Sequence, residues 1–441
     1  MASLPGLTDY LAAPNIEESS NKPQIVSVPA GSEWRVQIPQ GSKLTIKQLS
    51  GIAEIFGTEL SLDVPYLFGP TNLAIYAVED SEIEWISPEL TSQSMSDDTN
   101  MKYIYNVHFA LEKLRVSSFD GPRVLIVGES CTGKTSLAKI LCAYALKIKS
   151  YQPLMVNLDP QECIYSPPGC LTATPISDLL DVSYNTWGQS MTSGATKLHS
   201  KQPLVKNFGL EHISENRGLY MNTVQSLADT IHSRLASDAI VRRSGLIIDT
   251  PALEQLDGDL TKIKEIVSLF KVNAIIVCGH DDSIAMKLNE VLPVESLTIV
   301  RLPTSSGIVK TDDVFKRALQ TSAIREYFYG DSKMVLSPYT IGADFDMLTV
   351  WQPTSTLNTN SPTNQNLIPV DINASNLQHA MVAISYAPRK ASGDIVSNSP
   401  ILGFALIMEV NDTKKRLRIL LPVPGRLPEF AMVLTSYRYL E

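Results

Sequence analysis

The stretch 121–147, GPRVLIVGESCTGKTSLAKILCAYALK, constrains the fold more than any other part of the chain. Four consecutive apolar residues, 124–127, run into a glycine-rich turn, and a long apolar-periodic segment follows. A buried strand, a glycine loop and a helix in this order form the phosphate-binding unit of P-loop nucleotide-binding proteins. The stretch therefore predicts an α/β domain whose central sheet carries a phosphate site.

The loop itself fits the pattern GxxxxGK[ST] at every fixed position of residues 128–135. Its glycines let successive backbone N–H groups point at a phosphate, while Lys134 neutralises phosphate oxygens and Thr135 is placed to bind Mg²⁺. The N-terminus of the following helix adds a partial positive charge. We therefore expect a nucleotide and Mg²⁺ as ligands. The expected nucleotide-binding residues of this loop are Gly128, Cys131, Thr132, Gly133, Lys134, Thr135 and Ser136.

The identity of the base is a separate question. A GTP-binding protein would normally show an Asn-Lys-x-Asp signature after a later strand, whereas this chain offers Cys-Gly-His-Asp at residues 278–281. We therefore favour adenine, and hence ATP. His280 and Asp281 are interpreted as an ordinary turn at the end of a strand.

Two aspartates end later apolar runs. Asp159 closes the run 153–159, PLMVNLD, and Asp249 closes GLIID. The carboxyl ends of parallel strands are where α/β sheets place their ligands. One carboxylate could hold Mg²⁺ through water and the other could take a proton from an attacking hydroxyl, so Thr135, Asp159 and Asp249 are the candidate metal residues. The alternative for each aspartate is a helix N-cap, which Asp favours.

The rest of the chain suggests three domains. Short alternating strands with glycine turns indicate an N-terminal β-sandwich over 1–99, and 87–100, SPELTSQSMSDDTN, is expected to be a polar linker. Helical periodicity begins at Met101, and apolar runs then alternate with helices. This pattern predicts a parallel sheet flanked by helices, a P-loop ATP-binding domain over 100–335. Strand patterns return afterwards, so 336–441 is expected to be a small β-rich α+β domain, interrupted by a low-complexity polar loop at 354–366.

Composition argues against several classes of protein and of binding site. A net charge of −9 over 441 residues argues against a generally basic nucleic-acid binder, so any RNA contact should be local or indirect. The five cysteines form no CxxC pair and the six histidines are scattered, which indicates neither a disulfide framework nor a zinc site. We find no secretory signal and no apolar run of about 18 residues, so we expect an intracellular protein that does not span a membrane.

Several separated motifs together resemble one family. They are GPRVLIVGESCTGKT, VNLDPQE, NTWGQSMTSGAT, GLIIDTP, AIREYFYG and the closing SPILGFALIMEVN, LLPVPGRLP and LTSYRYLE. From about residue 25 to the end, the chain resembles the polynucleotide 5′-hydroxyl-kinase family. Within it, the chain is most similar to the fungal branch, the ATP-binding subunits of pre-mRNA cleavage factor IA.

The resemblance implies roles for further residues. Glu33 of the sandwich would accept a hydrogen bond from the adenine amino group, and Asn72 stands where relatives have a lysine near the nucleotide. In active members, a carboxylate of the DxxQ segment activates the RNA 5′-hydroxyl, and Asp159 with Gln161, spaced one residue closer than in that pattern, resembles this segment. Thr186 and Trp187 only loosely resemble the pair that positions the RNA end.

The lid is where the sequence departs most from active relatives. The segment DVFKRALQTSAIREYFYG keeps Lys316, Arg317 and Arg325, but Gln320, Thr321 and Ala323 stand where active relatives are richer in arginine. Loss of an arginine that contacts the transition state costs ~10³–10⁵ in rate.

Two functions therefore remain open. In the first, the chain is a nuclear, ATP-holding structural subunit of the mRNA 3′-end cleavage and polyadenylation machinery. It would dock the cleavage factor IA scaffold, which binds the RNA polymerase II C-terminal domain, and would reach the other subunits through that scaffold. In the second, the chain is an active polynucleotide 5′-hydroxyl kinase, with Asp159, Lys134 and Arg317 as catalytic residues.

Overall fold

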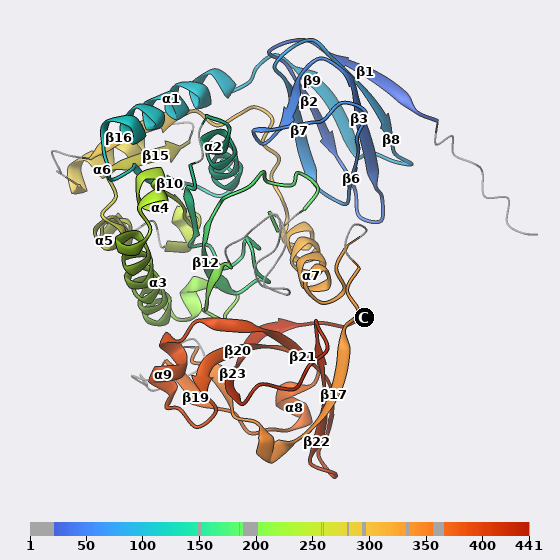
Figure 1. Ribbon diagram of the computed structural model, residues 1–441, viewed down its shortest axis with the longest axis vertical. Coiled ribbons are helices and arrows are strands. Elements are labelled where there is room, and N and C mark those ends of the chain that lie inside the picture. The colour runs from blue at the N-terminus through green and yellow to red at the C-terminus, as the bar shows by residue number, and fades with distance from the viewer. Residues whose placement is uncertain are drawn as a thin grey trace, which may run out of the picture. The chain divides into compact units, whose positions relative to one another are not determined.

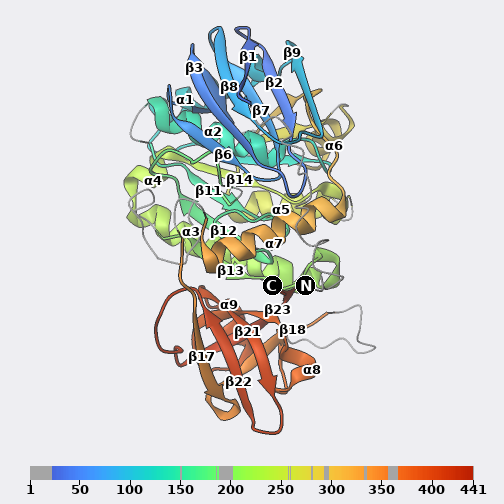
Figure 2. The same ribbon diagram turned by 90° about the vertical axis from the view of Figure 1, so that its right-hand side faces the viewer.

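The computed structural model describes residues 22–148, 151–184, 186–187, 202–256, 258, 260–279, 282–292, 297–331, 335–355 and 366–440. The chain divides into two compact units. The first comprises residues 1–55 and 59–97, and the second comprises 56–58 and 98–441. Figures 1 and 2 show both units along the chain.

The first unit is a β-sandwich of two sheets. One sheet has the order β1-β8-β3-β6 and the other the order β5-β4-β7-β2-β9. Inward-facing residues such as Trp34, Ile46 and Ile75 are buried between them, as alternation along the strands predicts. The strands are β1 Gln24–Val28, β2 Glu33–Gln37, β3 Leu44–Ser50, β4 Ala53–Ile55, β5 Thr58–Glu59, β6 Pro65–Phe68, β7 Asn72–Ala77, β8 Ser81–Ile86 and β9 Ser92–Ser96.

Strand β9 corrects one expectation. The linker prediction for 87–100 is wrong over Ser92–Ser96, because this segment pairs antiparallel with β2 along its whole length, from Ser92 opposite Gln37 to Ser96 opposite Glu33. An edge strand is held by backbone hydrogen bonds to one neighbour, so its side chains need not be apolar. Composition alone could not distinguish such a strand from a linker.

The second unit contains the expected P-loop sheet. Its order is β13-β12-β11-β14-β10-β15-β16, in which β11, β14, β10, β15 and β16 are parallel and β12 and β13 add two antiparallel strands. The strands are β10 Arg123–Gly128, β11 Leu154–Asn157, β12 Cys170–Pro175, β13 Leu204–Asn207, β14 Leu246–Asp249, β15 Ala274–Cys278 and β16 Thr298–Leu302. The predicted parallel sheet is confirmed. The antiparallel edge was not predicted, because its strands are short and lie among loops.

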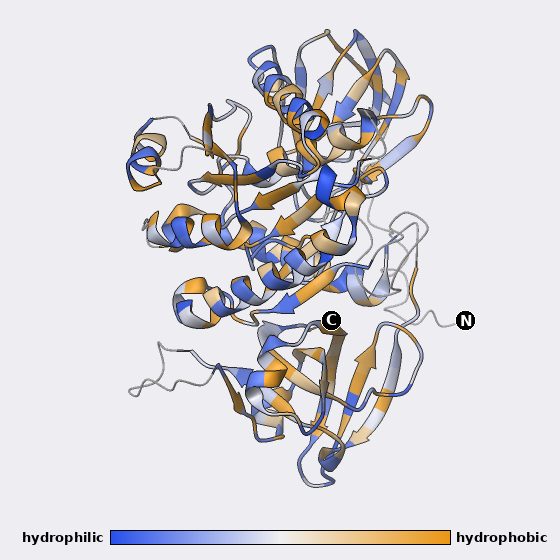
Figure 3. Cartoon of the chain, turned by 60° about the vertical axis from the view of Figure 1, so that its left-hand side comes forward, coloured by the Kyte–Doolittle hydropathy of each residue, from blue (hydrophilic) through white to orange (hydrophobic). Residues whose placement is uncertain are grey.

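Helices cover both faces of this sheet (Figure 1). Residues of α3, α5 and α6 share one core with Leu125, Val156 and Ile248 of the strands, while α2, with α1 beside it, packs against β10 and β14 on the other face. Figure 3 shows the central strands as mainly hydrophobic and the helices as mixed. The helices are α1 Met101–Ser117, α2 Lys134–Ile148, α3 Arg217–Ser237, α4 Ala239–Ser244, α5 Leu260–Phe270, α6 Ser283–Val291 and α7 Asp313–Tyr329, with 3₁₀ turns η2 Ile213–Glu215 and η3 Leu253–Leu256.

The C-terminal part is a seven-stranded sheet of order β17-β22-β21-β20-β23-β18-β19 with two short helices. Its elements are β17 Tyr339–Asp344, η4 Phe345–Met347, β18 Val350–Pro353, β19 Leu367–Pro369, α8 Ala374–Leu377, β20 Ala380–Pro388, α9 Gly393–Asn398, β21 Ile401–Asn411, β22 Arg416–Leu421 and β23 Phe430–Arg438. The predicted β-rich α+β character is confirmed.

This sheet shares a core with the P-loop part. Side chains of β12, β13 and α7 form one buried cluster with side chains of the C-terminal sheet, among them Cys170, Tyr327 and Phe404. The Phe404 N–H donates to the Tyr327 hydroxyl at 2.9 Å. Because α7 carries residues of this cluster, the C-terminal sheet fixes the position of the lid helix. Within the described residues, no helix has both the length and the apolar character needed to cross a bilayer.

Candidate nucleotide-binding site

The glycine loop has the backbone that a phosphate cradle requires. A Cβ atom on Gly128 would lie 2.4 Å from the Cys278 carbonyl oxygen, so no larger residue fits there. Gly133 has a φ of +83°, in the left-handed region that favours glycine. Cys131 adopts φ +53°, a conformation uncommon for a residue with a side chain. The tight curl between β10 and α2 is therefore built into the chain itself.

Lys134 and Thr135, the first two residues of α2, lie inside this curl. The Lys134 ammonium donates to the Glu129 carbonyl oxygen at 2.7 Å, and the Thr135 hydroxyl donates to Asp249 Oδ2 at 2.6 Å. Lys134 is buried, so its positive charge is held within the loop. Lys134, Thr135 and Asp249, which the sequence assigned to phosphate and metal chemistry, therefore lie together.

Asp249, the last residue of β14, is fully buried. Its second oxygen, Oδ1, has no hydrogen-bond partner among the described residues. Burial raises the pKa of the Asp249 carboxyl to about 7, against the hydrogen bond from Thr135 and the charge of Lys134. A buried oxygen without a partner is costly, and a bound cation or an ordered water would satisfy it.

This donor set fits Mg²⁺. Among the described residues, no group of three or more His, Cys, Asp or Glu side chains could hold a metal ion by itself. Mg²⁺ usually takes one or two protein oxygens and completes its shell with waters and phosphate oxygens. The Thr135 hydroxyl and the orphaned oxygen of Asp249 offer such a partial shell beside the loop.

Asp159 lies two residues beyond the end of β11 and is held by its own segment. Asn157, fully buried, accepts from the Asp159 N–H and donates to the Asp159 carbonyl, both at 3.0 Å. Asp159 Oδ1 accepts the Gln161 N–H at 2.9 Å. Burial raises the pKa of the Asp159 carboxyl, opposed by that N–H and by the charges of Lys134 and Lys316. A carboxylate with a raised pKa is a stronger base, so Asp159 suits proton abstraction.

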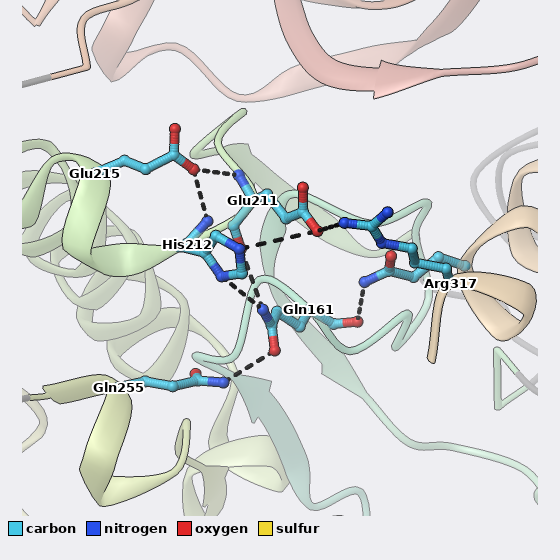
Figure 4. Close-up of polar contacts among 7 residues, drawn as sticks. Gln161, Glu211, His212, Glu215, Gln255 and Arg317 are labelled. Atoms are coloured by element: carbon cyan, nitrogen blue, oxygen red, sulfur yellow. Dashed lines mark hydrogen bonds and ion pairs between the residues drawn. The ribbon is translucent and has the colours of Figure 1, made fainter. Parts of the chain in front are cut away.

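Gln161 is the centre of a polar network beside Asp159 (Figure 4). Its amide nitrogen lies 3.2 Å from His212 Nδ1 and 3.4 Å from the Glu211 carbonyl oxygen, and its amide oxygen accepts from Gln255 at 2.9 Å. Both ends of the side chain are therefore occupied, which holds residues 159–161, the DPQ segment, in place. Glu211 also forms an ion pair with Arg317, with 3.5 Å between the charged atoms.

The lid helix α7 is docked against the same segment. Gln320 is buried and donates to the Gln161 carbonyl oxygen at 3.2 Å. The residues before α7 reach the phosphate loop, where the Thr311 hydroxyl lies 3.7 Å from the Cys131 sulfur. Arg317, in contrast, is largely exposed and faces Glu211. Gln320, which stands where active relatives are richer in arginine, thus makes a structural contact.

The Thr186 and Trp187 pair lies close to the far end of α7. The Thr186 hydroxyl donates to Glu326, and the Trp187 ring is buried with its centroid 5.7 Å from the Lys139 ammonium. The remainder of the NTWGQSMTSGAT motif, like His280 and Asp281, lies outside the described residues.

Glu33 and Asn72 belong to the first unit. Glu33 begins β2 and pairs with Arg35 at 2.9 Å, while Asn72 begins β7 opposite Gln37. They lie at opposite ends of the β2–β7 ribbon, about 13 Å apart at ~3.3 Å per residue. Only an extended ligand could contact both side chains.

Sequence reasoning missed three contributions to this site, namely the side chain of Asn157 and the hydrogen bonds of Gln320 and Glu326. Asn157 left a signal, since it is a polar residue within an otherwise apolar strand run. No sequence pattern indicates the hydrogen bonds of Gln320 and Glu326, because their partners are 159 and 140 residues away in the sequence.

Models of known protein families match three parts of the chain. Family models match as the N-terminal β-sandwich domain of polyadenylation factor over 27–118, the P-loop of mRNA cleavage and polyadenylation factor CLP1 over 128–330, and pre-mRNA cleavage complex II protein Clp1 over 336–441. The chain belongs to the CLP1 family of mRNA cleavage and polyadenylation factors. The resemblance drawn from the motifs is confirmed.

Individual relatives are similar over nearly their whole length. The factor CLP1 of Eremothecium gossypii is 56% identical over 415 residues, 93% of each chain, and that of Saccharomyces cerevisiae is 50% identical over the full length of both chains. Two solved structures match with TM-scores of 0.91 at 50% identity, covering 96% of this chain and 99% or more of theirs. One is a Clp1p–Pcf11p complex. The other describes an extended Pcf11p–Clp1p interface and the basis for ATP loss in a glycine-to-arginine mutant.

The pH dependence of the protein's stability provides a test of the environment of Glu326. Burial, the largest cause, raises the pKa of its carboxyl from 4.5 to about 7, with Asp331 and Asp181 adding to the rise and the Thr186 hydroxyl opposing it. Folding therefore takes up a proton between these values, so the stability that this group contributes falls as pH rises from 4.5 through 7. Glu326→Gln keeps the acceptor for Thr186 without the titration. It should stabilise the protein by about 1–3 kcal/mol at pH 8 and by much less at pH 5.

Urea unfolding at the two pH values measures this difference. Glu290→Gln, at an exposed carboxylate of α6, is the matched control and should change stability little at either pH. An equal effect of Glu326→Gln at both pH values would contradict a proton held by Glu326 in the folded protein.

Proposed function

We propose that this chain is a structural subunit of the pre-mRNA 3′-end cleavage and polyadenylation machinery that holds ATP and Mg²⁺ as retained ligands. The observation that carries the proposal is the pairing of a complete phosphate and metal site with a lid that uses a glutamine where active relatives are richer in arginine. The loop at 128–135, Thr135 and the buried Asp249 make up the phosphate and metal site. In the lid, the Gln320 side chain donates a hydrogen bond to the Gln161 carbonyl oxygen.

The residues proposed to bind the nucleotide are those that the sequence predicts. Gly128, Cys131, Thr132, Gly133 and Ser136 would surround the phosphates with backbone and side-chain donors, while Lys134 would neutralise them. Thr135 and Asp249 would bind Mg²⁺, with Asp159 reaching the metal through water. Glu33 would accept from the adenine amino group, and Asn72 would provide a weaker contact than the lysine of relatives. The relative whose mutant loses ATP supports a nucleotide at this site.

Retention without transfer follows from the lid. A transferring phosphoryl group needs positive charge around its equatorial oxygens, and a missing lid arginine costs ~10³–10⁵ in rate. Here the Gln320 side chain donates to a backbone carbonyl oxygen, and Arg317 forms an ion pair with Glu211. A retained ligand still stabilises the fold by RT ln(1 + [L]/Kd), about 4 kcal/mol at a thousandfold excess over Kd.

The second candidate is an active polynucleotide 5′-hydroxyl kinase. Asp159 favours it, because it is buried, carries a raised pKa and is oriented by the Gln161 N–H. In that case Asp159 would take the proton of an RNA 5′-hydroxyl. Lys134 and Arg317 would stabilise the phosphoryl group.

The partner in this proposal is a scaffold subunit equivalent to Pcf11p. Two solved relatives at 50% identity are described in terms of their interface with Pcf11p. We propose that the scaffold docks on the P-loop domain, over residues 100–335, and connects the chain to the RNA polymerase II C-terminal domain and to the other subunits. RNA would be contacted indirectly or weakly, and the nucleus is the site of action.

The phosphate loop provides the first test. Lys134→Ala combined with Thr135→Ala should lower ATP occupancy and the melting temperature together, because the same phosphate contacts serve both. Lys287→Ala, an exposed lysine of α6, is the control and should alter neither. Nucleotide extraction and calorimetry give the two readouts. Unchanged ATP affinity in the double variant would remove the loop from the proposal.

Asp159 separates the two candidate functions. Asp159→Asn keeps the shape and a hydrogen-bond acceptor but cannot take a proton from a hydroxyl. A structural subunit carrying this change should support normal pre-mRNA cleavage in a reconstituted reaction. An essential kinase would lose ~10²–10⁴ in turnover, and with it cleavage. Abolished cleavage by a folded variant that keeps ATP and its scaffold would reverse the order of the two candidates.

A further inference from the structure

The lid helix α7 carries a lysine that neither candidate function uses. Lys316 lies in the first turn of α7, and its side chain is half-buried. Asp312 and Asp313 precede it by four and three residues, a spacing at which opposite charges commonly pair on a helix. Among the described residues, however, the Lys316 ammonium forms no ion pair and no hydrogen bond. Its charge is therefore available to a ligand.

Contacts on both sides of Lys316 along the chain place it beside the phosphate loop. Before it, the Thr311 hydroxyl lies 3.7 Å from the Cys131 sulfur of the loop. After it, Gln320 donates to the Gln161 carbonyl oxygen at 3.2 Å. Residues four apart lie on the same face of a helix, so Lys316 shares the face of Gln320 and lies one turn nearer to the loop.

The neighbouring Arg317 has a different environment. Adjacent residues are turned by about 100° around a helix axis, so the two side chains leave α7 in different directions. The Arg317 guanidinium lies 3.5 Å from the Glu211 carboxylate, and its side chain is 72% exposed (Figure 4). The lid therefore carries one cation that forms an ion pair at the surface and one, Lys316, on the face that is docked against the site.

The charge of Lys316 acts on groups at two sides of the site. Burial raises the pKa of the Asp159 carboxyl, and the charges of Lys134 and Lys316 oppose that rise. At the loop, burial favours a higher pKa of the Cys131 thiol, but the hydrogen bonds of Thr311 and the charge of Lys316 contribute to a net lowering. The Lys316 ammonium is therefore within electrostatic reach of both the phosphate loop and the candidate base.

A cation between the loop and the candidate base is suited to one part of a nucleotide. In P-loop proteins the loop holds the inner phosphates, and the group that activates an acceptor lies beyond the terminal phosphate. We propose that Lys316 binds the terminal phosphate of the retained nucleotide and thereby makes the site selective for a nucleoside triphosphate over a diphosphate. The inference rests on the proposed function, because it concerns the nucleotide that this function retains.

A lysine in this position suits retention of the nucleotide. Its ammonium is a compact charge on a flexible stem, whereas the planar guanidinium of arginine offers a fork of donors that can bind two phosphate oxygens at once. A contact that is equally strong with bound ATP and with the transition state increases affinity without increasing the rate of transfer. Lys316 would therefore help to hold ATP without replacing the arginines of an active lid.

The alternative role for Lys316 is to balance the negative charge of Asp159. A balancing charge would affect the binding of ATP and of ADP to a similar extent, because it would act on the site as a whole. A contact with the terminal phosphate would affect ATP much more, since ADP lacks that group. The ratio of the two affinities therefore distinguishes the two roles.

The test exchanges the nucleotide of the full-length chain against labelled ATP and labelled ADP and measures both affinities. The wild type should prefer ATP. Lys316→Met keeps the apolar stem and should weaken ATP binding about tenfold to a hundredfold, as expected for one charge-assisted hydrogen bond, and ADP binding less than about threefold. Lys316→Arg keeps the charge and should retain most of the preference. Lys287→Met, which removes an exposed positive charge from α6, is the control and should leave both affinities unchanged.

The outcomes separate this inference from the proposed function. Wild type that binds no nucleotide overturns the proposed function and this inference with it. Wild type that holds ATP and ADP equally well, or Lys316→Met that loses both to the same extent, overturns only the role of Lys316. Loss of the ATP preference in Arg317→Met but not in Lys316→Met also overturns it, because Arg317 would then be the lid cation. Melting temperatures without nucleotide should agree among the variants, which excludes a misfolded lid as the cause.

Discussion

The carboxylate of Asp249 is the constraint on which the nucleotide site depends. It is fully buried at the end of β14; its Oδ2 accepts from the Thr135 hydroxyl, and its Oδ1 has no hydrogen-bond partner among the described residues. Leaving a buried acceptor unsatisfied costs about 1–3 kcal/mol. The strand that holds Asp249 pairs with β10, which leads into the phosphate loop, and with β11, which leads to Asp159. Ligand binding at this point would therefore relieve a cost that the fold itself creates.

Helix α7 connects that site to the C-terminal sheet. Its beginning follows Thr311, which contacts Cys131 of the phosphate loop, its middle residue Gln320 bonds to the DPQ segment, and its end carries Tyr327 into the shared core. In an active kinase, a lid needs arginines that reach the phosphoryl group and freedom to close. Here contacts before the helix, at its middle and at its end hold it against the site. A retained ATP is consistent with such a lid.

Local patterns explain what the sequence could predict. The phosphate loop, the parallel strands β10, β11, β14 and β15, and the positions of Lys134, Thr135 and Asp249 follow from short motifs beside apolar runs, whereas strand β16 was not predicted. Strand β9 was missed because its pairing partner β2 lies about 60 residues earlier and its own side chains are polar. The bonds of Gln320 and Glu326 were missed for the same physical reason, since tertiary packing joins segments that carry no mutual signal. The division into domains at 99 and 335 stays a prediction, because the structure groups the P-loop and C-terminal parts in one unit.

We propose that this chain holds ATP without transferring its phosphoryl group. The most direct measurement incubates the purified wild-type protein with γ-labelled ATP and a 5′-hydroxyl oligoribonucleotide, and follows label in the RNA and in the bound nucleotide. We expect the label to stay in protein-bound ATP and the RNA to gain none above a no-enzyme control. Phosphorylated RNA that depends on Asp159 would contradict it and would establish the chain as a kinase.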